Sequence, residues 1–201
     1  MIRVVVMAAG QATRMGTDKL ALAWHGATVL GYVVHEALDA LAESELNGEL
    51  VVIARKPPAV YLSPSVYALF TKNKGEWRLL PAPVPLAQTI KTGLEGVSDD
   101  VVGIAFLPGD QVGVNSPVLA RLIKNFAHTE PDALVPVAGT VPGSPVFFHR
   151  KLIPELSSLS GEQGGKTILK NYEGKLKTYQ VNSDFFTDLD TPEEYNKFKK
   201  V

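Results

Sequence analysis

The chain has 201 residues, a formal net charge of −1 and no cysteine, which excludes disulfides, thiolate metal sites and thiol nucleophiles. Its length favours one domain over residues 1–201, and its near-neutral charge argues against a surface that coats nucleic acid. Because it has neither an apolar run long enough to span a membrane nor a basic leader, we expect a cytoplasmic protein without nucleic-acid or membrane partners.

The first predicted element is a buried strand over residues 2–6, rich in β-branched side chains. It leads into a loop whose small residues let backbone N–H groups converge on an anion. The guanidinium of Arg14 and the ammonium of Lys19 are well suited to a polyphosphate. Alternatively, the two cations are merely solvated in a strand-to-helix loop. The predicted triphosphate cradle comprises Ala8, Ala9, Gly10, Arg14, Gly16 and Lys19.

The elements after the loop indicate a parallel sheet with crossover helices. A turn at His25-Gly26 precedes a helix over residues 29–43, which Thr28 caps, and a second buried strand over 50–54. A helix over 86–97 has Gln88 and Thr89 near its N-terminal end, where hydrogen-bond donors could meet the nucleotide. Between the last two elements, we predict a short helix over 65–70 and a strand over 77–80.

A fourth strand, over residues 101–107, places Asp110 just after its carboxyl end. Ligands of open α/β sheets bind at such ends, so Asp110 and the first loop should share one crevice. Ser116 is the predicted N-cap of the next helix, which runs through His128. The remaining predicted elements are strands over 133–137, 146–148 and 175–181, a pocket-lining loop over 139–145, and helices over 152–159 and 165–172.

Near residue 190, Thr191 and Glu194 form a capping box with Pro192 at the first helical position. This arrangement leaves Asp188 and Asp190 on the loop before the helix. The four histidines show no metal-ligand spacing, and no motif suggests a serine or cysteine nucleophile.

Ala8-Ala9-Gly10, Arg14-Met15-Gly16 and Lys19 resemble the signature of the MobA-like nucleotidyltransferases, especially molybdenum cofactor cytidylyltransferases. Residues 107–111 look like the Mg²⁺-binding strand end of that family, 143–148 like its acceptor-side segment, and 160–164 like its Gly-Asp-x-Gly loop. Residues 188–194 resemble its Asp-x-Asp-Thr-Pro-Glu element. The resemblance implies an α/β class, with a three-layer α/β/α Rossmann-like nucleotidyltransferase fold and a mixed, mainly parallel sheet.

Nucleotidyl transfer needs cations and in-line geometry but no protein nucleophile. Mg²⁺ takes one or two protein carboxylates with phosphate oxygens and water. We therefore assign Asp110 as the first metal ligand, with Asp190 or Asp188 second, and Arg14, Lys19 and Asp110 as the catalytic residues. Taken alone, Asp110 could be a turn residue and Asp190 an additional cap, and Glu162 is more often solvated than functional.

Several positions depart from the family pattern. Val112 stands where proline is usual, Ser144 replaces histidine, Glu162 replaces aspartate, and residues 86–90 stand where a Gly-Met-Ser-like motif is expected. These positions belong to regions that the family uses for base and acceptor. They leave the proposed phosphate and metal groups intact.

The predicted function is transfer of CMP from CTP to a phosphate-bearing acceptor such as molybdopterin, with release of pyrophosphate. Ala8-Ala9-Gly10 resembles the cytidylyl branch, whereas guanylyltransferases more often have Ala-Gly-Gly. A molybdoenzyme or accessory protein would receive the product. One alternative is another triphosphate with a sugar phosphate or cofactor precursor as acceptor. The other is a non-catalytic accessory protein that binds a nucleotide or cofactor.

Overall fold

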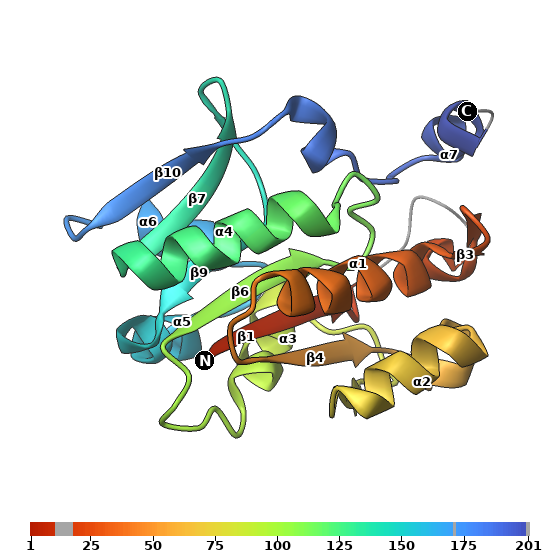
Figure 1. Cartoon of the computed structure of the whole chain (residues 1–201), viewed down its shortest axis with the longest axis horizontal. Coiled ribbons are helices and arrows are strands. Elements are labelled where there is room, and N and C mark those ends of the chain that lie inside the picture. The colour runs from red at the N-terminus through yellow and green to blue at the C-terminus, as the bar shows by residue number, and fades with distance from the viewer. Residues whose placement is uncertain (11–17, 171, 200–201) are drawn as a thin grey trace.

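The computed structural model describes residues 1–10, 18–170 and 172–199 and contains a mixed, mainly parallel sheet (Figure 1). Its strand order is β10-β7-β9-β6-β1-β4-β5, and β8 also pairs with β7. The strands β9 and β8 run antiparallel to their neighbours, while the other pairs are parallel, as predicted. The strands are β1 (Ile2–Ala8), β4 (Gly48–Ala54), β5 (Glu76–Leu79), β6 (Gly103–Pro108), β7 (Ala133–Ala138), β8 (Val141–Pro142), β9 (Val146–His149) and β10 (Leu176–Gln180).

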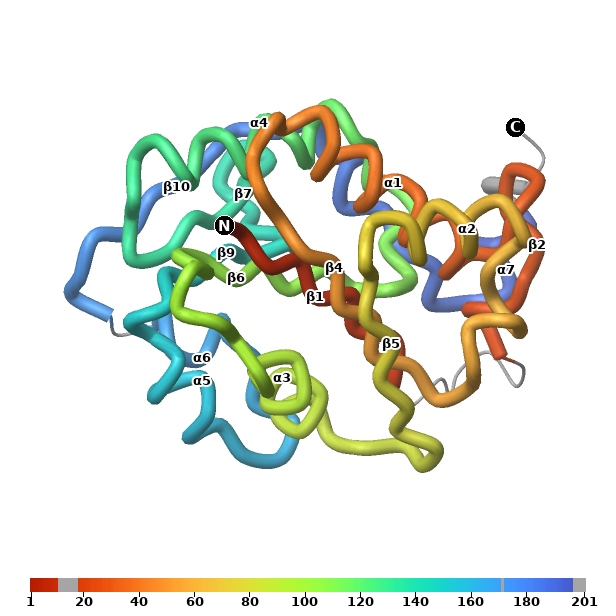
Figure 2. Tube along the Cα trace, turned by 60° about the horizontal axis from the view of Figure 1, so that its bottom comes forward, coloured from red at the N-terminus to blue at the C-terminus, as the bar shows by residue number. Residues whose placement is uncertain are grey.

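Helices cover both faces of this sheet and make three layers, which Figure 2 shows. Side chains alternate between faces along a strand, so Val4 and Val6 of β1 join one hydrophobic core while Val5 joins the other. The first core lies under α1, α2 and α4, and the second lies against α3 and α5. The layers are formed by α1 (Val29–Glu43), α2 (Pro64–Lys72) and α4 (Ser116–Thr129) on one side, and α3 (Leu86–Leu94), α5 (Ile153–Ser158) and α6 (Gly165–Leu169) on the other.

Local capping decides where several helices begin. The Thr28 hydroxyl accepts a hydrogen bond from the Gly31 N–H at 2.9 Å, which starts α1 where the sequence predicts it. For α4 the predicted cap is wrong: Asn115 accepts from the Val118 N–H at 3.1 Å, and Ser116 is the first helical residue. Asparagine and serine are both good N-caps, so the sequence did not distinguish two adjacent candidates.

Other predicted boundaries also shift. Helix α3 ends at Leu94 and not at residue 97, because Glu95 is extended and Gly96 has a φ of +59°. The predicted loop over 139–145 contains the short strand β8. The predicted helix over 165–172 ends at Leu169. None of the described helices has the length and apolarity to cross a membrane.

Arg3 joins the amino ends of β1 and β4 to the carboxyl end of α3 through one ion pair and several carbonyl contacts. Arg3 is 2% exposed, and its Nε donates to Glu49 at 2.6 Å. Its other guanidinium nitrogens donate to the carbonyls of Gly93, Glu95 and Gly96 at 2.7–3.0 Å. The last turn of α3 and the two residues after the helix therefore supply the carbonyl groups that hold Arg3.

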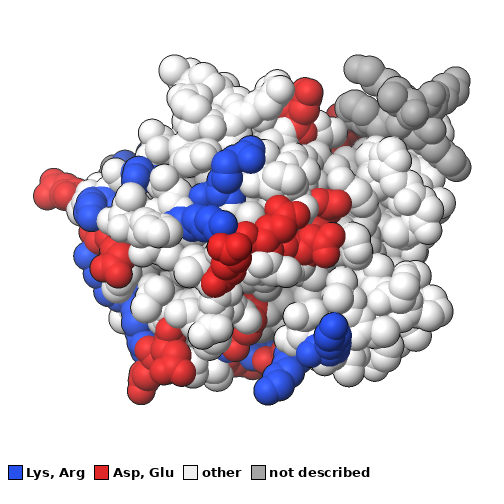
Figure 3. Space-filling view, viewed as in Figure 1, with Lys and Arg blue, Asp and Glu red and all other residues white. Residues whose placement is uncertain are grey.

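A short hairpin and the last described helix meet near the opposite end of the sheet. The hairpin joins β2 (Ala23–Trp24) to β3 (Ala27–Thr28) through His25 and Gly26, both at positive φ. The Tyr195 hydroxyl of α7 (Pro192–Lys199) donates to the Ala23 carbonyl at 2.9 Å, which places α7 beside the hairpin (Figure 1). On the neighbouring α1 and α4 face, charges of both signs are mixed, and Lys124 lies 3.7 Å from Glu45 (Figure 3).

Candidate active site

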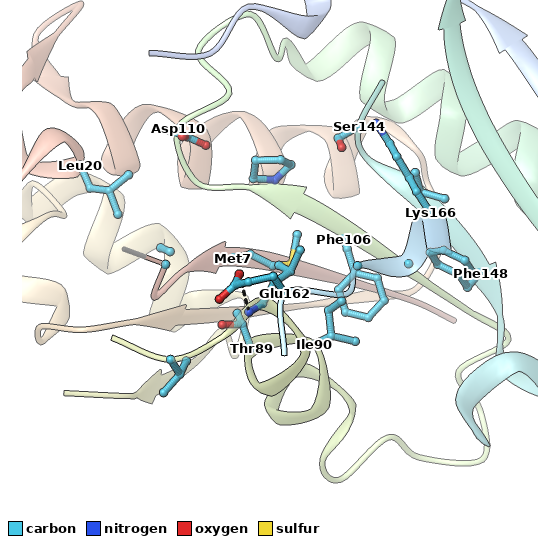
Figure 4. A pocket seen from close by; sticks show the side chains of 18 of the residues that line it. Met7, Leu20, Thr89, Ile90, Phe106, Asp110, Ser144, Phe148, Glu162 and Lys166 are labelled. Carbon is cyan, nitrogen blue, oxygen red and sulfur yellow. Dashed lines mark hydrogen bonds between the residues drawn. The ribbon is translucent and has the colours of Figure 1, made fainter. Parts of the chain in front are cut away.

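A cavity of about 680 Å³ lies at the carboxyl ends of β1 and β6. Its floor is apolar, whereas its rim carries charged and polar side chains from several loops (Figure 4). This location agrees with the rule that open α/β sheets bind ligands beyond the carboxyl ends of their strands. The floor includes Met7, Ile90, Phe106, Val146 and Phe148, and the rim includes Lys19, Thr89, Asp110, Ser144, Glu162 and Lys166.

Lys19 connects two carboxylates from distant parts of the chain. Its ammonium is in direct contact with Asp110 Oδ2 and lies 3.1 Å from Asp190 Oδ1. Lys19 belongs to a 3-10 turn (Lys19–Ala21), Asp110 follows β6, and Asp190 precedes α7. The structure thus brings together three of the predicted catalytic and metal-binding residues.

The environment favours the charged form of Lys19. Its side chain is only 14% exposed, and this burial alone would lower the pKa of the amine. The carboxylates of Asp110 and Asp190 outweigh burial and raise that pKa above its ordinary value. Asp188 lies close enough to feel the same charges: burial, followed by repulsion from Asp190 and Asp110, raises the pKa of its carboxyl.

Asp110 is positioned by a close approach of its turn to β1. The Gly109 N–H donates to the Met7 carbonyl at 2.9 Å. A Cβ at position 109 would lie 3.0 Å from the Ala8 Cβ and 3.1 Å from the Met7 carbonyl oxygen, so glycine permits this approach. Gln111 then fixes the turn from the other side, since its buried amide donates to the carbonyls of Ser144 and Phe185.

Asp190 is held by the predicted capping box. Glu194 Oε2 accepts hydrogen bonds from the N–H groups of Asp190 and Thr191 at 2.9 and 3.0 Å. The Thr191 hydroxyl accepts from the Glu194 N–H at 3.2 Å. Because both reciprocal bonds are present, the box fixes the backbone that carries Asp190 toward Lys19.

The residue before Lys19 has its own anchors. Asp18 Oδ2 accepts from the Tyr61 hydroxyl at 3.0 Å and lies 2.8 Å from the Lys56 ammonium. Burial would raise the pKa of Asp18, but its contacts with Lys56 and Tyr61 lower it. Burial and the Asp18 contact raise the pKa of the Tyr61 hydroxyl. These long-range contacts fix the backbone beside Lys19, and no sequence motif indicated them.

The donors at the start of α3 are partly used by another loop. Leu86 N–H donates to Glu162 Oε2 at 3.4 Å, and Ala87 N–H donates to the Gly161 carbonyl at 3.1 Å. Thr89 is buried and lines the cavity. Gln88 instead lines a separate depression with Arg78 and Glu95, so the structure does not bring it to the cavity.

The predicted phosphate cradle is only partly described. Ala8 and Gly10 line the cavity, whereas Ala9 is fully buried in the core beside α3. Arg14 and Gly16 lie outside the described residues. Sequence reasoning did not single out Lys166, which lines the cavity and extends toward Ser144 in Figure 4. Glu162, interpreted from the sequence as more often solvated than functional, is exposed, and one of its oxygens accepts a hydrogen bond at the α3 N-terminus.

The donors around Lys19 fit a hard divalent cation. Asp110 and Asp190 already direct carboxylate oxygens at one positive group, and Mg²⁺ commonly uses one or two carboxylates with phosphate and water oxygens. In the described parts of the chain, no cluster of three or more His, Cys, Asp or Glu is arranged to hold a metal. Any cation would therefore need oxygens from a ligand or solvent to complete its shell.

Residues 4–176 match the sequence profile of the MobA-like NTP transferase domain. The chain is 26% identical to the purine catabolism protein PucB of Bacillus subtilis (strain 168), with 98% of this chain and 95% of that protein covered. It is 24% identical to a probable molybdenum cofactor guanylyltransferase of Bacillus cereus (strain G9842), with 98% and 94% covered.

A solved structure has the same fold. Rv0371c from Mycobacterium tuberculosis H37Rv superimposes with a TM-score of 0.77 at 24% identity and covers 100% of this chain and 98% of its own. A second structure of that protein, in complex with manganese, gives a TM-score of 0.72 at 22% identity, with 99% and 98% of the two chains covered.

Proposed function

The chain belongs to the MobA-like NTP transferase family, and on this premise we propose that it transfers CMP from CTP to a phosphate-bearing acceptor such as molybdopterin. The observation that supports this proposal is the convergence of Asp110 and Asp190 on the Lys19 ammonium at one edge of a cavity. A cation between two carboxylates at strand ends suits a triphosphate and its counterion.

In the proposed reaction, an acceptor phosphate oxygen attacks the α-phosphorus of CTP. The new phosphorus–oxygen bond forms as the bond to the bridging oxygen breaks, and pyrophosphate leaves with the electron pair. Lys19 would neutralise charge that develops on the phosphates, and Arg14 would hold the β- and γ-phosphates. This displacement requires no protein nucleophile.

We assign the divalent cation to Asp110 and Asp190, with Asp188 beside them. Mg²⁺ supplies charge neutralisation and orients the phosphate oxygens when it is bound. The capping box holds Asp190 in place, and Gly109 with Gln111 holds Asp110. A manganese complex of the related fold is consistent with this choice of donors.

We place the nucleotide along Ala8, Gly10 and Thr89 and the acceptor toward Ser144 and Lys166. The altered acceptor-side positions, Ser144 and Glu162, leave the identity of the acceptor as the part to be tested. A relative named as a probable guanylyltransferase makes GTP the main competitor of CTP. The proposed setting is the cytoplasm, where a molybdoenzyme or its accessory protein would receive the product.

A nucleotide panel tests the donor substrate. Thermal unfolding is measured with CTP, GTP, ATP or UTP, each with and without Mg²⁺. A ligand at about 100 times its Kd adds about 2.7 kcal/mol of stability. We expect a Mg²⁺-dependent shift with CTP. A shift with GTP alone would make GTP the donor substrate in place of CTP. No shift with any triphosphate would favour a non-catalytic accessory protein.

Pyrophosphate release with purified molybdopterin, or with sugar phosphates, then tests the acceptor. The variant Asp110→Asn is expected to lose turnover, while Asp99→Asn serves as the matched control. Asp99 is an exposed carboxylate that pairs with Arg150 outside the cavity. Equal turnover by both variants would contradict the assigned metal site.

A further inference from the structure

The contact of Lys19 with two carboxylates has a consequence for how the site is loaded. Its ammonium touches Asp110 and lies 3.1 Å from Asp190, while the side chain is 14% exposed. Lysine has no acceptor atoms and carries a compact charge. A positive group of the protein therefore lies between the oxygens that we assign to a metal.

We propose that Lys19 acts as a placeholder for the divalent cation, so that metal binds weakly alone and enters the site together with the triphosphate. This inference rests on the proposed function, because it takes Asp110 and Asp190 as the metal ligands. It concerns the order of loading, which the assignment of ligands does not determine. The same lysine then has two positions, on the carboxylates before loading and on the phosphates afterwards.

Electrostatics gives the reason for weak binding of metal alone. A divalent cation that approaches Asp110 and Asp190 meets the Lys19 charge at contact distance, and this repulsion is strong in a partly buried site. The cation must also give up hydration water, which Mg²⁺ does reluctantly. A triphosphate removes the first obstacle because its oxygens offer Lys19 another set of anionic partners.

The local backbone allows this exchange without a large rearrangement. Ala21 N–H donates to the Asp18 carbonyl at 3.0 Å, and Leu22 N–H donates to the Lys19 carbonyl at 3.2 Å. Leu20 is buried in the core between these bonds. The turn stays fixed, so only the four-carbon stem of Lys19 needs to change rotamer.

Two other lysines near the site provide a contrast. Lys56 lies 2.8 Å from Asp18, on the outer side of the turn. Lys166 lines the cavity, and its ammonium is 3.4 Å from the Pro142 carbonyl oxygen. In the described structure, neither lysine contacts Asp110 or Asp190, so neither should compete with a metal there.

The experiment measures Mn²⁺ binding to the full chain without nucleotide, by the electron paramagnetic resonance signal of free Mn²⁺. For Lys19→Met we expect a Kd at least about tenfold lower than for the wild type, because one contact charge is removed. Lys166→Met is the matched control and should stay within about twofold of the wild type. A Lys19→Met protein that binds Mn²⁺ no more tightly than the wild type would overturn the inference.

A second measurement uses the wild type and does not depend on whether a Lys19 variant folds. A methylene-bridged analogue of the stabilising triphosphate should tighten Mn²⁺ binding about tenfold or more. By linkage, Mn²⁺ should tighten analogue binding by the same factor. Equal Mn²⁺ affinity with and without the analogue would overturn the inference. For the first measurement, Lys19→Gln provides a second neutral variant.

Asp110→Asn separates failure of the inference from failure of the proposed function. If this variant abolishes analogue-supported Mn²⁺ binding while Lys19→Met gains no affinity, the metal site stands and the placeholder is wrong. If analogue-supported binding survives in Asp110→Asn, the assigned metal site and the placeholder are both overturned. Loss in Asp110→Asn together with a gain in Lys19→Met supports both.

Discussion

Arg3 and Lys19 are two largely buried cations near opposite ends of β1, and their partners differ in kind. Arg3 is fully enclosed by one carboxylate and three backbone carbonyls. Lys19 lies at the edge of a cavity and contacts two carboxylates from loops. Carbonyl groups within the fold hold an ion in one place, whereas charged groups beside a cavity can take another partner. The comparison distinguishes a structural ion from an exchangeable one.

The same difference separates the carboxylates at the two ends of the sheet. At the amino end of β7, the contact with Lys151 contributes most to lowering the pKa of Asp132, whose carboxylate also accepts hydrogen bonds from the Lys175 N–H and the Tyr172 hydroxyl. At the cavity, burial and neighbouring carboxylates raise the pKa of Asp188. The Asp132 carboxylate is paired within the fold, whereas the carboxylates at the cavity repel one another, and a bound cation would relieve that repulsion.

The largest expected effect is on catalysis. Asp110→Asn should lower kcat by roughly 10³–10⁵-fold, because it weakens the site of the cation that neutralises phosphate charge in phosphoryl transfer. This loss corresponds to about 4–7 kcal/mol of transition-state stabilisation. The free energy of unfolding should change little, since Asp110 lies at the cavity and not in the core. Pyrophosphate release and urea unfolding measure the two quantities, and a large loss of stability would make Asp110 a structural residue.

The second prediction is a large loss of stability with little change in turnover, at the amino end of β1. Arg3→Met should lower the free energy of unfolding by about 3–5 kcal/mol, because it leaves Glu49 without its buried partner and carbonyls without donors. The turnover of folded protein should stay within about twofold. Urea unfolding at pH 7 gives the stability, and Arg3→Lys, which keeps only the charge, should lose an intermediate amount. A selective loss of kcat in Arg3→Met would contradict the comparison.

A smaller effect depends on pH. Because the folded pKa of Asp132 is lowered, its ionised form stabilises the protein above the unfolded pKa of about 3.9, and this stability is lost as pH falls through the folded pKa. Asp132→Asn should therefore cost about 1–2 kcal/mol at pH 7 and progressively less below pH of about 4. Urea unfolding at several pH values tests this, and a cost independent of pH would exclude the ionic explanation.

The smallest effect is at the capping box that holds Asp190. Glu194→Ala should cost about 1 kcal/mol, a typical value for the loss of a helix cap. Because Asp190 loses its backbone anchor, the Mg²⁺ concentration needed for half-maximal rate should also rise severalfold. Thermal unfolding and a metal titration of the rate measure the two effects. Glu193→Ala, which removes an exposed acid from the same turn, should change neither.

Local chemistry made parts of the fold predictable. Thr28 and the Thr191–Glu194 pair use hydrogen bonds that span three residues, so the sequence contains the whole motif. Asp110 follows β6, and the rule that ligands bind beyond the carboxyl ends of strands placed it at the cavity. Boundaries depended on finer differences: Asn115 displaced the predicted cap Ser116, and β8 is too short for a side-chain pattern.

Most contacts between distant segments were not predictable from a single sequence, although the strand-end rule did place Asp110 and the first loop in one crevice. The bridge from Lys19 to Asp190 spans 171 positions, and nothing local specifies it. Gln88 and Thr89 were equivalent candidates until packing fixed how α3 is rotated about its axis. The contact of Glu162 with Leu86 spans 76 positions and likewise depends on tertiary structure. The sequence predicted which residue types form the site, whereas packing decides which of them meet.

Asp190 comes late in the chain, so the folding of the sheet and the completion of the site are separate events. The last strand, β10, ends at Gln180, so the sheet can be complete before Asp190 and the Tyr195 contact are in place. The segment that carries Asp190 is anchored on its own, because Leu189 is fully buried in the core and the Thr187 carbonyl accepts a hydrogen bond from the Gly113 N–H at 2.9 Å. The site is therefore complete only when this late segment docks through Leu189 and brings Asp190 to Lys19.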